Sequence, residues 1–476
     1  MLFSRAFRLN KFQSELDFVD VDLRGDTPLF IDPYAISKRN DSWSIDCHNQ
    51  IITFFERLVE AIKENRTSDA FLLLQHLDEP NDIHLGLSRG KPQGKGVSGK
   101  QAKDLYDSLK ASSAVKTGFL NSLSDCELLI PGISRDKISD ITANIIRRFL
   151  LEYTAKQCFL HNIPTTAVPS GFTWDSATGL WEEDYVQLPV YRGERIVLVP
   201  KAIARIDFSY DHQEYYNHFV LNYLQAEHLR ANTALVHTLK KGTKKVYKKD
   251  LKGKHPCNKE FLYNFSKNHP EVLAQYRESR DVKIKSTDDA SMDASSLAAI
   301  ASELTTKLDS IKPGNDAATQ YHNLSIGLLE YIFYPELIYP VKEQEIHSGR
   351  KRIDISFSNA AREGIFHRLH NIHGFPCSYL MFECKNYTND PANPELDQLS
   401  GRFSPNRGRV GFLLCRNFSD KKLFIKRCND TAKDDRGVII PLDDEDVKTL
   451  IAARSGNQYS VIDKFLDDRL REILCS

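Results

Sequence analysis

The chain has 476 residues, of which 41% are hydrophobic and 27% are charged, and its 64 basic side chains balance its 64 acidic ones. A chain of this length exceeds one ordinary hydrophobic core, so we expect a soluble protein with several domains. The zero net charge excludes a strongly basic or acidic protein, and only local patches can therefore indicate a charged partner.

Targeting and redox features are sparse. No apolar run reaches the roughly 18 residues of a membrane helix, and the apolar part of the first residues is too short for a secretory signal. The nine cysteines form no CxxC pair, which indicates reduced thiols rather than a zinc site or a disulfide framework. We therefore expect a cytoplasmic protein without a membrane partner.

Residues 1–210 are predicted to form a mixed α/β domain with a role in recognition, regulation or oligomerisation. Short apolar runs indicate strands, and a repeat of apolar residues every three to four positions indicates helices. The predicted strands cover 18–23, 28–33 and 195–200, and the predicted helices cover 51–62 and 139–158.

Two features of this domain resemble sites but have simpler explanations. The stretch Gly94–Lys100 fits the GxxxxGK pattern of a phosphate-binding loop, but Gln101 stands where a magnesium-binding hydroxyl belongs. Asp136 and Asp140 lie one turn apart on a predicted helix. Acidic residues are common near helix starts, so we interpret the first feature as a glycine-rich loop and the second as a solvated helix face.

Residues 211–310 are predicted to form a mainly helical connector that carries a basic surface. An aromatic-rich helix is expected at 215–229, and the small polar residues at 286–296 are typical of a linker. Between them, lysines recur every four residues and would form one stripe on a helix, which suits a phosphate backbone. The alternative is a solvated basic face. The candidate nucleic-acid contacts in this stripe are Lys244, Lys245, Lys248 and Lys249.

Residues 311–476 show the clearest order of elements. A helix is predicted at 316–333, followed by strands at 352–357, 379–385 and 409–415. A further helix is expected to start at Asn393–Pro394–Glu395, because Asn is a good cap, Pro suits the first helical position and an acid suits the first turn.

Charged residues stand at the ends of two of these apolar strands. Side chains alternate along a strand, so Glu383 and Lys385 point to the same face. Asp354 occupies a similar apolar frame on the preceding strand. Burying such charges is costly unless they are paired or used. A purely structural alternative is a buried Asp354–Lys385 ion pair with Glu383 exposed at the strand end.

The order helix, strand with Asp354, strand with Glu383-x-Lys385, helix, strand resembles the PD-(D/E)XK, or restriction-endonuclease-like, nuclease superfamily. The resemblance covers about the last third of the chain, and the proline of the superfamily's name is absent before Asp354. It implies an α/β (α+β) multidomain protein whose carboxy-terminal mixed β-sheet is flanked by helices.

The resemblance also implies roles for individual residues. Asp354, Glu383 and the Cys384 carbonyl would bind Mg²⁺, with Mn²⁺ as an alternative, since hard oxygen ligands suit these ions. Lys385 would orient the attacking water. The supporting candidates are Glu330 and Gln398 in the site, and Arg350, Arg352 and Arg402 as nucleic-acid contacts.

The leading expectation is therefore a Mg²⁺-dependent endonuclease that acts on DNA as a restriction or antiphage defence effector. Homo-oligomerisation and an activating partner protein are expected as well. The alternatives are an RNase, for example one acting on transfer RNA, and a non-cleaving nucleic-acid-binding or scaffold protein that retains the fold. A complete set of Asp354, Glu383 and Lys385 argues against a decayed site.

Overall fold

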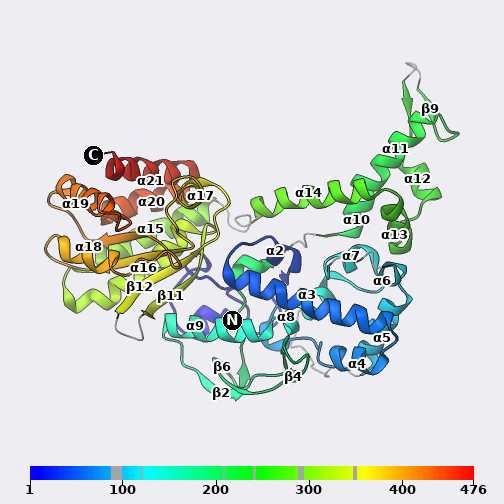
Figure 1. Ribbon diagram of the computed structural model, residues 1–476, viewed down its shortest axis with the longest axis horizontal. Coiled ribbons are helices and arrows are strands. Elements are labelled where there is room, and N and C mark those ends of the chain that lie inside the picture. The colour runs from blue at the N-terminus through cyan, green and yellow to red at the C-terminus, as the bar shows by residue number, and fades with distance from the viewer. Residues whose placement is uncertain are drawn as a thin grey trace.

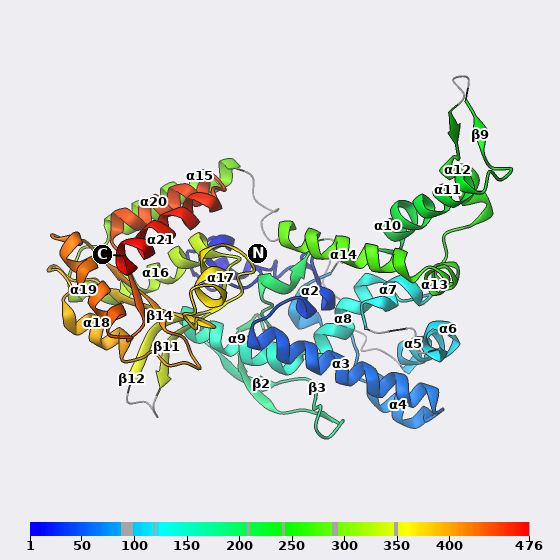
Figure 2. The same cartoon turned by 45° about the horizontal axis from the view of Figure 1, so that its top comes forward.

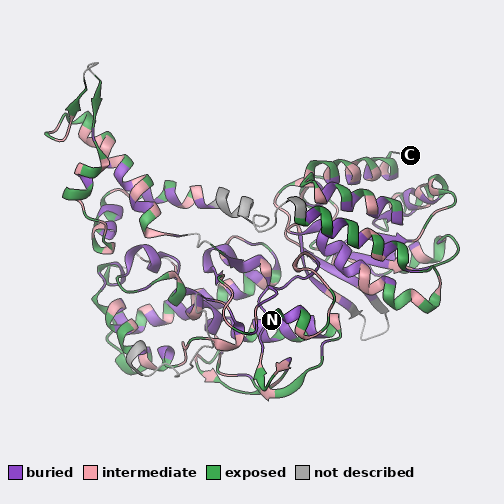
Figure 3. Cartoon of the chain, turned by 180° about the vertical axis from the view of Figure 1, so that it is seen from behind, coloured by how far each residue is buried: buried purple, intermediate pink, exposed green. Residues whose placement is uncertain are grey.

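The computed structural model describes residues 1–86, 99–117, 120, 122–206, 210–239, 243–287, 294–346 and 351–475. Their buried side chains gather in two hydrophobic cores, seen as the purple interiors of Figure 3. The first core gathers side chains from Phe3 to Tyr276 together with Tyr334, Ile338 and Tyr339, and the second gathers side chains from Leu297 to Ile473 together with Leu160. We call residues 1–287 the N-terminal unit and residues 294–475 the C-terminal domain.

Helices form most of the first part of the N-terminal unit, and its short strands pair only two by two. The helices are α1 (Phe3–Ala6), α2 (Pro33–Ser37), α3 (Ser42–Lys63), α4 (Thr67–Leu74), α5 (Gly99–Ala111), α6 (Ser113–Lys116), α7 (Asp125–Leu129), α8 (Arg135–Ile145) and α9 (Arg147–His161). The strands are β1 (Phe30–Ile31), β2 (Thr166–Pro169), β3 (Thr173–Trp174), β4 (Trp181–Glu182), β5 (Tyr185–Leu188), β6 (Val190–Tyr191), β7 (Glu194–Arg195) and β8 (Ala204–Arg205).

The predicted elements of this unit are partly confirmed. The helix at 51–62 is the second half of α3, whose start is capped by the Asp41 side chain. The single helix predicted at 139–158 is wrong, because Ile146 leaves helical geometry and separates α8 from α9. The strands predicted at 18–23 and 195–200 are buried, but they meet only through an isolated bridge between Phe18 and Pro200.

A second part of the N-terminal unit forms an arm that projects away from the C-terminal domain (Figures 1 and 2). It contains α10 (His212–Glu214), a π-helical turn (Tyr215–Val220), α11 (Leu221–Arg230), β9 (His237–Thr238), β10 (Lys244–Lys245), α12 (Lys248–Lys254), α13 (Lys259–Asn268) and α14 (Pro270–Thr287). The described part of this segment is mainly helical, and its buried apolar side chains belong to the first core.

The lysine-rich stretch of the arm is not the single helix that its spacing predicts. Lys244 and Lys245 pair with β9 in an antiparallel hairpin, and α12 begins only at Lys248. The β-branched residues Thr243 and Val246 favour extended backbone over a helix. The basic side chains thus come from a hairpin and a short helix.

The C-terminal domain contains a five-stranded mixed sheet in the order β11 (Leu337–Ile346), β12 (Lys351–Asn359), β13 (Tyr379–Lys385), β14 (Val410–Cys415), β15 (Val438–Leu442). The first three strands are antiparallel, and β13, β14 and β15 are parallel. Every residue of β14 and β15 is buried, as expected of parallel strands covered on both faces.

Helices flank this sheet (Figure 1). They are α15 (Ala294–Ser310), α16 (Ala318–Phe333), α17 (Gly364–Asn371), α18 (Asn393–Ser400), α19 (Lys421–Lys433), α20 (Asp444–Ser455) and α21 (Tyr459–Leu474). The mixed α/β class is confirmed. Residues 294–310 pack in the second core, so the C-terminal domain begins earlier than the predicted boundary at 311.

The helix predicted to start at Asn393 is α18, although its cap is one residue earlier. Ala392 is the cap, and its N–H donates to Oε2 of Glu395 at 2.7 Å. None of the helices among the described residues is long and apolar enough to span a bilayer.

The two cores meet along α16. Gly327 lies under the N-terminal segment: a Cβ there would stand 2.6 Å from Nζ of Lys11 and 2.8 Å from Oε1 of Glu15. The Asp17 carboxylate accepts hydrogen bonds from the hydroxyl of Tyr153 at 2.7 Å and from the Tyr339 N–H of β11 at 3.1 Å. The N-terminal unit thus contacts the helix and the edge strand of the C-terminal sheet directly.

Candidate active site

Asp354 and Glu383 lie at the point where the β12–β13 ladder ends. The last paired residues of that ladder are Ile355 and Phe382, so the two acids are the next residues on neighbouring antiparallel strands. The Cys384 N–H donates to Oδ2 of Asp354 at 3.2 Å. The tertiary structure therefore brings together the two carboxylates that the sequence predicts.

The Glu383 carboxylate is fully buried and is held by two cations. Nζ of Lys385 lies 2.7 Å from its Oε1, and the Arg402 guanidinium pairs with its Oε2. Lys385 also donates to Oε1 of Gln398 at 3.2 Å. The alternative of a buried Asp354–Lys385 pair with an exposed Glu383 is wrong, because the lysine pairs with the buried glutamate.

Contrary to the prediction from the sequence, Arg402 does not lie where a nucleic acid could contact it. Its side chain is only 6% exposed and pairs with Glu383. Burial lowers the pKa of the Arg402 guanidinium, and the nearby Asp354 carboxylate opposes that shift. Gln398 lies in α18 and Arg402 lies two residues beyond its end, so α18 and the turn that follows it supply a partner to each charged residue of β13.

The Cys384 side chain points away from Glu383 and Lys385, as strand alternation requires. Burial and the Asp354 charge raise the pKa of its thiol well above the usual range, and a hydrogen bond with Ser325 of α16 opposes that shift. A protonated thiol is a poor metal ligand. In an antiparallel ladder the N–H and C=O of one residue face the same neighbour, so the Cys384 carbonyl lies on the Asp354 side.

These donors suit a hard divalent cation under one condition. Asp354, Glu383 and the Cys384 carbonyl offer oxygen ligands of the kind that Mg²⁺ takes, with waters and substrate oxygens completing the shell. Both oxygens of Glu383 already contact cations, so a metal would compete with Arg402 and Lys385 for this carboxylate. Among the described residues, no group of three or more His, Cys, Asp or Glu side chains is positioned to hold a metal.

Glu330 lies outside this cluster, although the sequence suggested a supporting role for it there. Its Oε2 is 3.1 Å from Nζ of Lys201 in the N-terminal unit, and its side chain is 1% exposed. Burial raises the pKa of Glu330 to about 8, and the Asp17 carboxylate adds to that shift while Lys201 opposes it. Glu330 is therefore part of the contact between the two cores.

The remaining predicted site residues are distributed as follows. Arg350 lies outside the described residues, as do 87–98 of the glycine-rich stretch and 288–293 of the predicted linker. Arg352 belongs to β12, but its side chain is outside the described part. The lysines of the hairpin and α12 lie at the far end of the molecule from β13 (Figures 1 and 2).

The hairpin lysines are accessible, and one lysine of α12 is partly used within the arm. Lys244, Lys245 and Lys249 are exposed. Nζ of Lys248 donates to the Asn217 carbonyl at 2.7 Å, and Nζ of Lys244 donates to Oδ1 of Asn232 at 2.6 Å. Neither contact neutralises a charge, so the basic character of the surface remains.

One part of the site was missed from the sequence. Asn386, which follows Lys385, is buried, and its amide donates to the carbonyls of Lys312 at 3.0 Å and Gly314 at 2.7 Å. Its Oδ1 accepts from Arg416 at 3.2 Å. This amide fixes the chain immediately after the Glu-x-Lys pair. The sequence contains no local pattern that identifies these partners, since they are distant along the chain.

The comparisons with known proteins cover only the N-terminal half. Residues 8–211 match the sequence model of a family described as a domain of unknown function (DUF8370), which is less than half of the chain. No curated protein and no solved structure matches the chain. The matched segment ends before the arm and before the strands that carry Asp354 and Glu383.

Proposed function

We propose that the C-terminal domain is a Mg²⁺-dependent nuclease that hydrolyses phosphodiester bonds in DNA. The observation that carries this proposal is the cluster of Asp354, Glu383 and Lys385 at adjoining strand ends, in which Glu383 is fully buried and the other two are partly buried. Buried ion pairs contribute little to stability compared with apolar side chains of the same size. Stability therefore does not account for these residue types, whereas a chemical role does.

In the proposed reaction, Asp354, Glu383 and the Cys384 carbonyl hold the ion. The bound metal supplies charge neutralisation on the scissile phosphate and a more acidic water. Lys385 orients the attacking water, and Gln398 holds the lysine in place through the 3.2 Å hydrogen bond. If the ion displaced Arg402 from Glu383, this guanidinium would be free to form charge-assisted hydrogen bonds with the phosphate.

The lysines of the arm support a polyanionic substrate. Lys244, Lys245 and Lys249 are exposed on a projecting hairpin and the helix that follows it, and such clusters bind phosphate backbones through counterion release. Because they lie far from β13, a nucleic acid that contacts both regions must run along the molecule. A role as a restriction or antiphage defence effector, with DNA recognised by the N-terminal unit, is part of this proposal.

One observation favours a second candidate. Both carboxylate oxygens of Glu383 contact cations, Lys385 and Arg402, so its charge is compensated without a metal, as in a non-cleaving nucleic-acid-binding protein. An RNase uses the same residues with a different substrate.

The test incubates the purified chain with plasmid, single-stranded DNA and total RNA, with Mg²⁺ or with EDTA. The variants are Asp354→Ala and Lys385→Ala, and the control is Asp397→Ala, which removes an exposed acid of α18 paired with Arg436. We expect Mg²⁺-dependent cutting of DNA by wild type and control and about a thousandfold less by the two site variants, a loss of the size known for key electrostatic groups. Full cutting by either site variant refutes the assigned site, and binding without cutting on every substrate supports the second candidate.

A further inference from the structure

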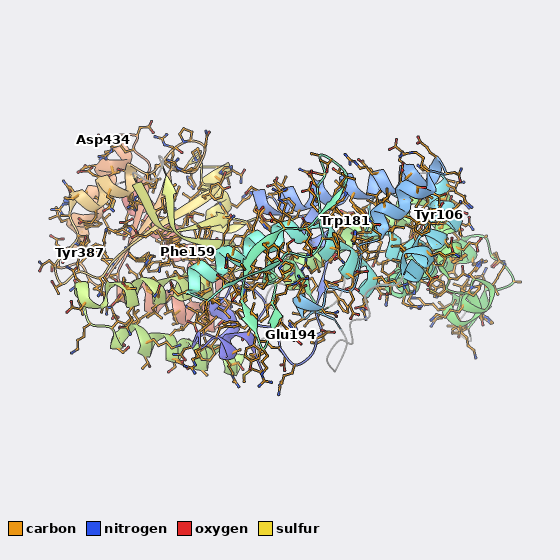
Figure 4. All side chains as sticks on the ribbon, turned by 90° about the horizontal axis from the view of Figure 1, so that it is seen from below. Tyr106, Phe159, Trp181, Glu194, Tyr387 and Asp434 are labelled. Carbon is orange, nitrogen blue, oxygen red and sulfur yellow. The ribbon has the colours of Figure 1, made fainter. Side chains whose placement is uncertain are left out.

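A cavity with a defined lining lies far from β13, in the N-terminal unit. It has a volume of about 520 Å³ and is lined by the segments 23–25 and 76–84, the α8–α9 junction, Gly171–Phe172 and the β7 residues Glu194 and Arg195. This volume is within the range of small-molecule sites, about 300–1,000 Å³. Figure 4 labels Glu194 from this lining, well separated from Tyr387 and Asp434 of the C-terminal domain.

One wall of the cavity contains a carboxylate between two guanidiniums. Asp82 pairs with Arg147, and Nε of Arg195 lies 2.7 Å from its Oδ2. Burial would raise the pKa of Asp82, but the two arginines outweigh it and hold that pKa below its usual value. One carboxylate cannot neutralise two guanidiniums, so this corner carries an excess of positive charge.

Gly171 keeps the backbone close to these guanidiniums. A Cβ at this position, where φ is +69°, would lie 3.0 Å from both Nε of Arg147 and Nη2 of Arg195. Arg195 donates from Nη1 to the Pro169 carbonyl at 2.6 Å, and its Nη2 has no acceptor among the described residues. The arginine pair therefore presents a donor to the cavity, and guanidinium donors suit a phosphate group.

Two buried polar atoms of the lining have no hydrogen-bond partner in the described part of the chain. They are Nδ1 of His84 and Oδ1 of Asn81. His84 is only 6% exposed and adopts the left-handed conformation, with φ of 56°. Burial lowers the pKa of His84, so its ring is neutral. Buried polar groups are almost always paired, and these two atoms are available to a polar ligand.

The mouth of the cavity offers a flat aromatic surface. The Phe172 ring is stacked on His76 with centroids 3.6 Å apart and planes at 23°, yet Phe172 is 41% exposed. An exposed ring of this kind is a platform for a nucleobase. The carboxylates of Asp78, Glu79 and Glu194 line the same cavity, and carboxylates commonly accept hydrogen bonds from ribose hydroxyls.

We propose that this cavity binds one nucleotide, with its base on Phe172 and its phosphate at the Arg147–Arg195 corner. The lining contains three arginines and four acidic residues, which disfavours a ligand with many negative charges. A nucleoside monophosphate is therefore expected to bind more tightly than a triphosphate. The proposal concerns a site separate from the C-terminal cluster and does not depend on nuclease activity.

The test measures binding to the full chain by calorimetry in EDTA, so that no nucleic acid is cut. The probes are the four ribonucleoside 5′-monophosphates, ATP, the nucleosides, inorganic phosphate, and a 5′-phosphorylated trinucleotide. We expect at least one monophosphate to bind with a Kd below about 1 mM, and the nucleosides and phosphate to bind at least about tenfold more weakly. Tighter binding of the trinucleotide assigns the site to the end of a nucleic acid, and tighter binding of a monophosphate assigns it to a free nucleotide.

Phe172→Ala and Asn81→Ala are the test variants, and Tyr185→Ala is the control, since Tyr185 of β5 is a 74% exposed aromatic residue. Loss of the stacking platform should weaken nucleotide binding about tenfold, and Phe172→Trp should retain it. Circular dichroism establishes that each variant is folded. Failure of every monophosphate to bind, equal binding of phosphate alone, or equal effects of Phe172→Ala and Tyr185→Ala would overturn the proposal.

Discussion

The pairing of one buried glutamate with two cations makes a sharp prediction for Arg402→Met. Removing one partner of a buried ion pair costs about 3–5 kcal/mol, because it leaves a charge uncompensated. Lys385 remains 2.7 Å from Glu383 and still compensates part of its charge. We therefore expect Arg402→Met to lower the free energy of unfolding in EDTA by about 2–3 kcal/mol, at or below the lower end of that range.

The same change frees Oε2 of Glu383 for a metal. A ligand at about 100 times its Kd stabilises the state that binds it by about 2.7 kcal/mol. Saturating Mg²⁺ should therefore restore most of the stability that Arg402→Met removes, and the variant should bind Mg²⁺ more tightly than wild type, in which Arg402 competes for the carboxylate.

Tryptophan fluorescence and amide hydrogen exchange show which domain Arg402→Met destabilises. The three tryptophans, Trp43, Trp174 and Trp181, all belong to the N-terminal unit, so fluorescence during urea unfolding reports that unit. Amide hydrogen exchange in β13 and β14 reports the C-terminal sheet. We expect Arg402→Met to accelerate exchange in these strands in EDTA, to lose that effect in Mg²⁺, and to leave the fluorescence transition unchanged.

Arg409→Met is the matched control, because Arg409 pairs with Asp435, which is 88% exposed. Exposed pairs contribute about 1 kcal/mol or less, and no dependence on Mg²⁺ is expected. If Arg402→Met destabilises the domain equally with and without Mg²⁺, or binds Mg²⁺ no better than wild type, the competition between Arg402 and a metal is refuted.

Three further predictions concern the core contact and the arm. Gly327→Ala should cost about 1–3 kcal/mol through overpacking against Lys11 and Glu15, measured by unfolding, whereas Gly253→Ala in α12, with open space around it, should cost nothing. Burial raises the pKa of Glu330 to about 8, so its contribution to stability is complete below about pH 4 and is lost as pH rises through 8. Between pH 5 and pH 8 the free energy of unfolding should therefore fall less in Glu330→Gln than in wild type. Neutralising the arm lysines should reduce the salt dependence of nucleic-acid binding. The slope of log K against log salt concentration should fall by up to about 0.9 for each phosphate that the arm no longer neutralises. The lysines to be changed are Lys244, Lys245, Lys248 and Lys249.

Each of these has a contrary outcome. Equal stability of Gly327→Ala and Gly253→Ala would remove the steric argument for the α16 contact. Parallel pH profiles of wild type and Glu330→Gln would show that Glu330 does not hold an extra proton in the folded state. An unchanged salt slope after lysine neutralisation would make the arm an ordinary solvated surface.

The sequence by itself determined the features that depend on near neighbours. Strand alternation puts Glu383 and Lys385 on one face, and the 2.7 Å contact between them follows from it. The Asn393–Pro394–Glu395 segment specifies the start of α18 to within one residue, since capping involves only the first turn. The predicted elements of the C-terminal domain appear in the predicted order as α16, β12, β13, α18 and β14, whereas β11, β15 and the other helices were not predicted.

The tertiary structure decided what depends on residues far apart in the chain. Arg402 turns from a predicted nucleic-acid contact into a partner of Glu383 because the turn after α18 brings its guanidinium against β13. Glu330 faces Lys201, a residue 129 positions away, because the N-terminal unit covers that side of α16. The lysine spacing at 240–252 fits a helix, but Lys244 and Lys245 pair with strand β9 in a hairpin instead. Local periodicity specifies which residues share a face, and only packing between distant segments specifies what that face meets.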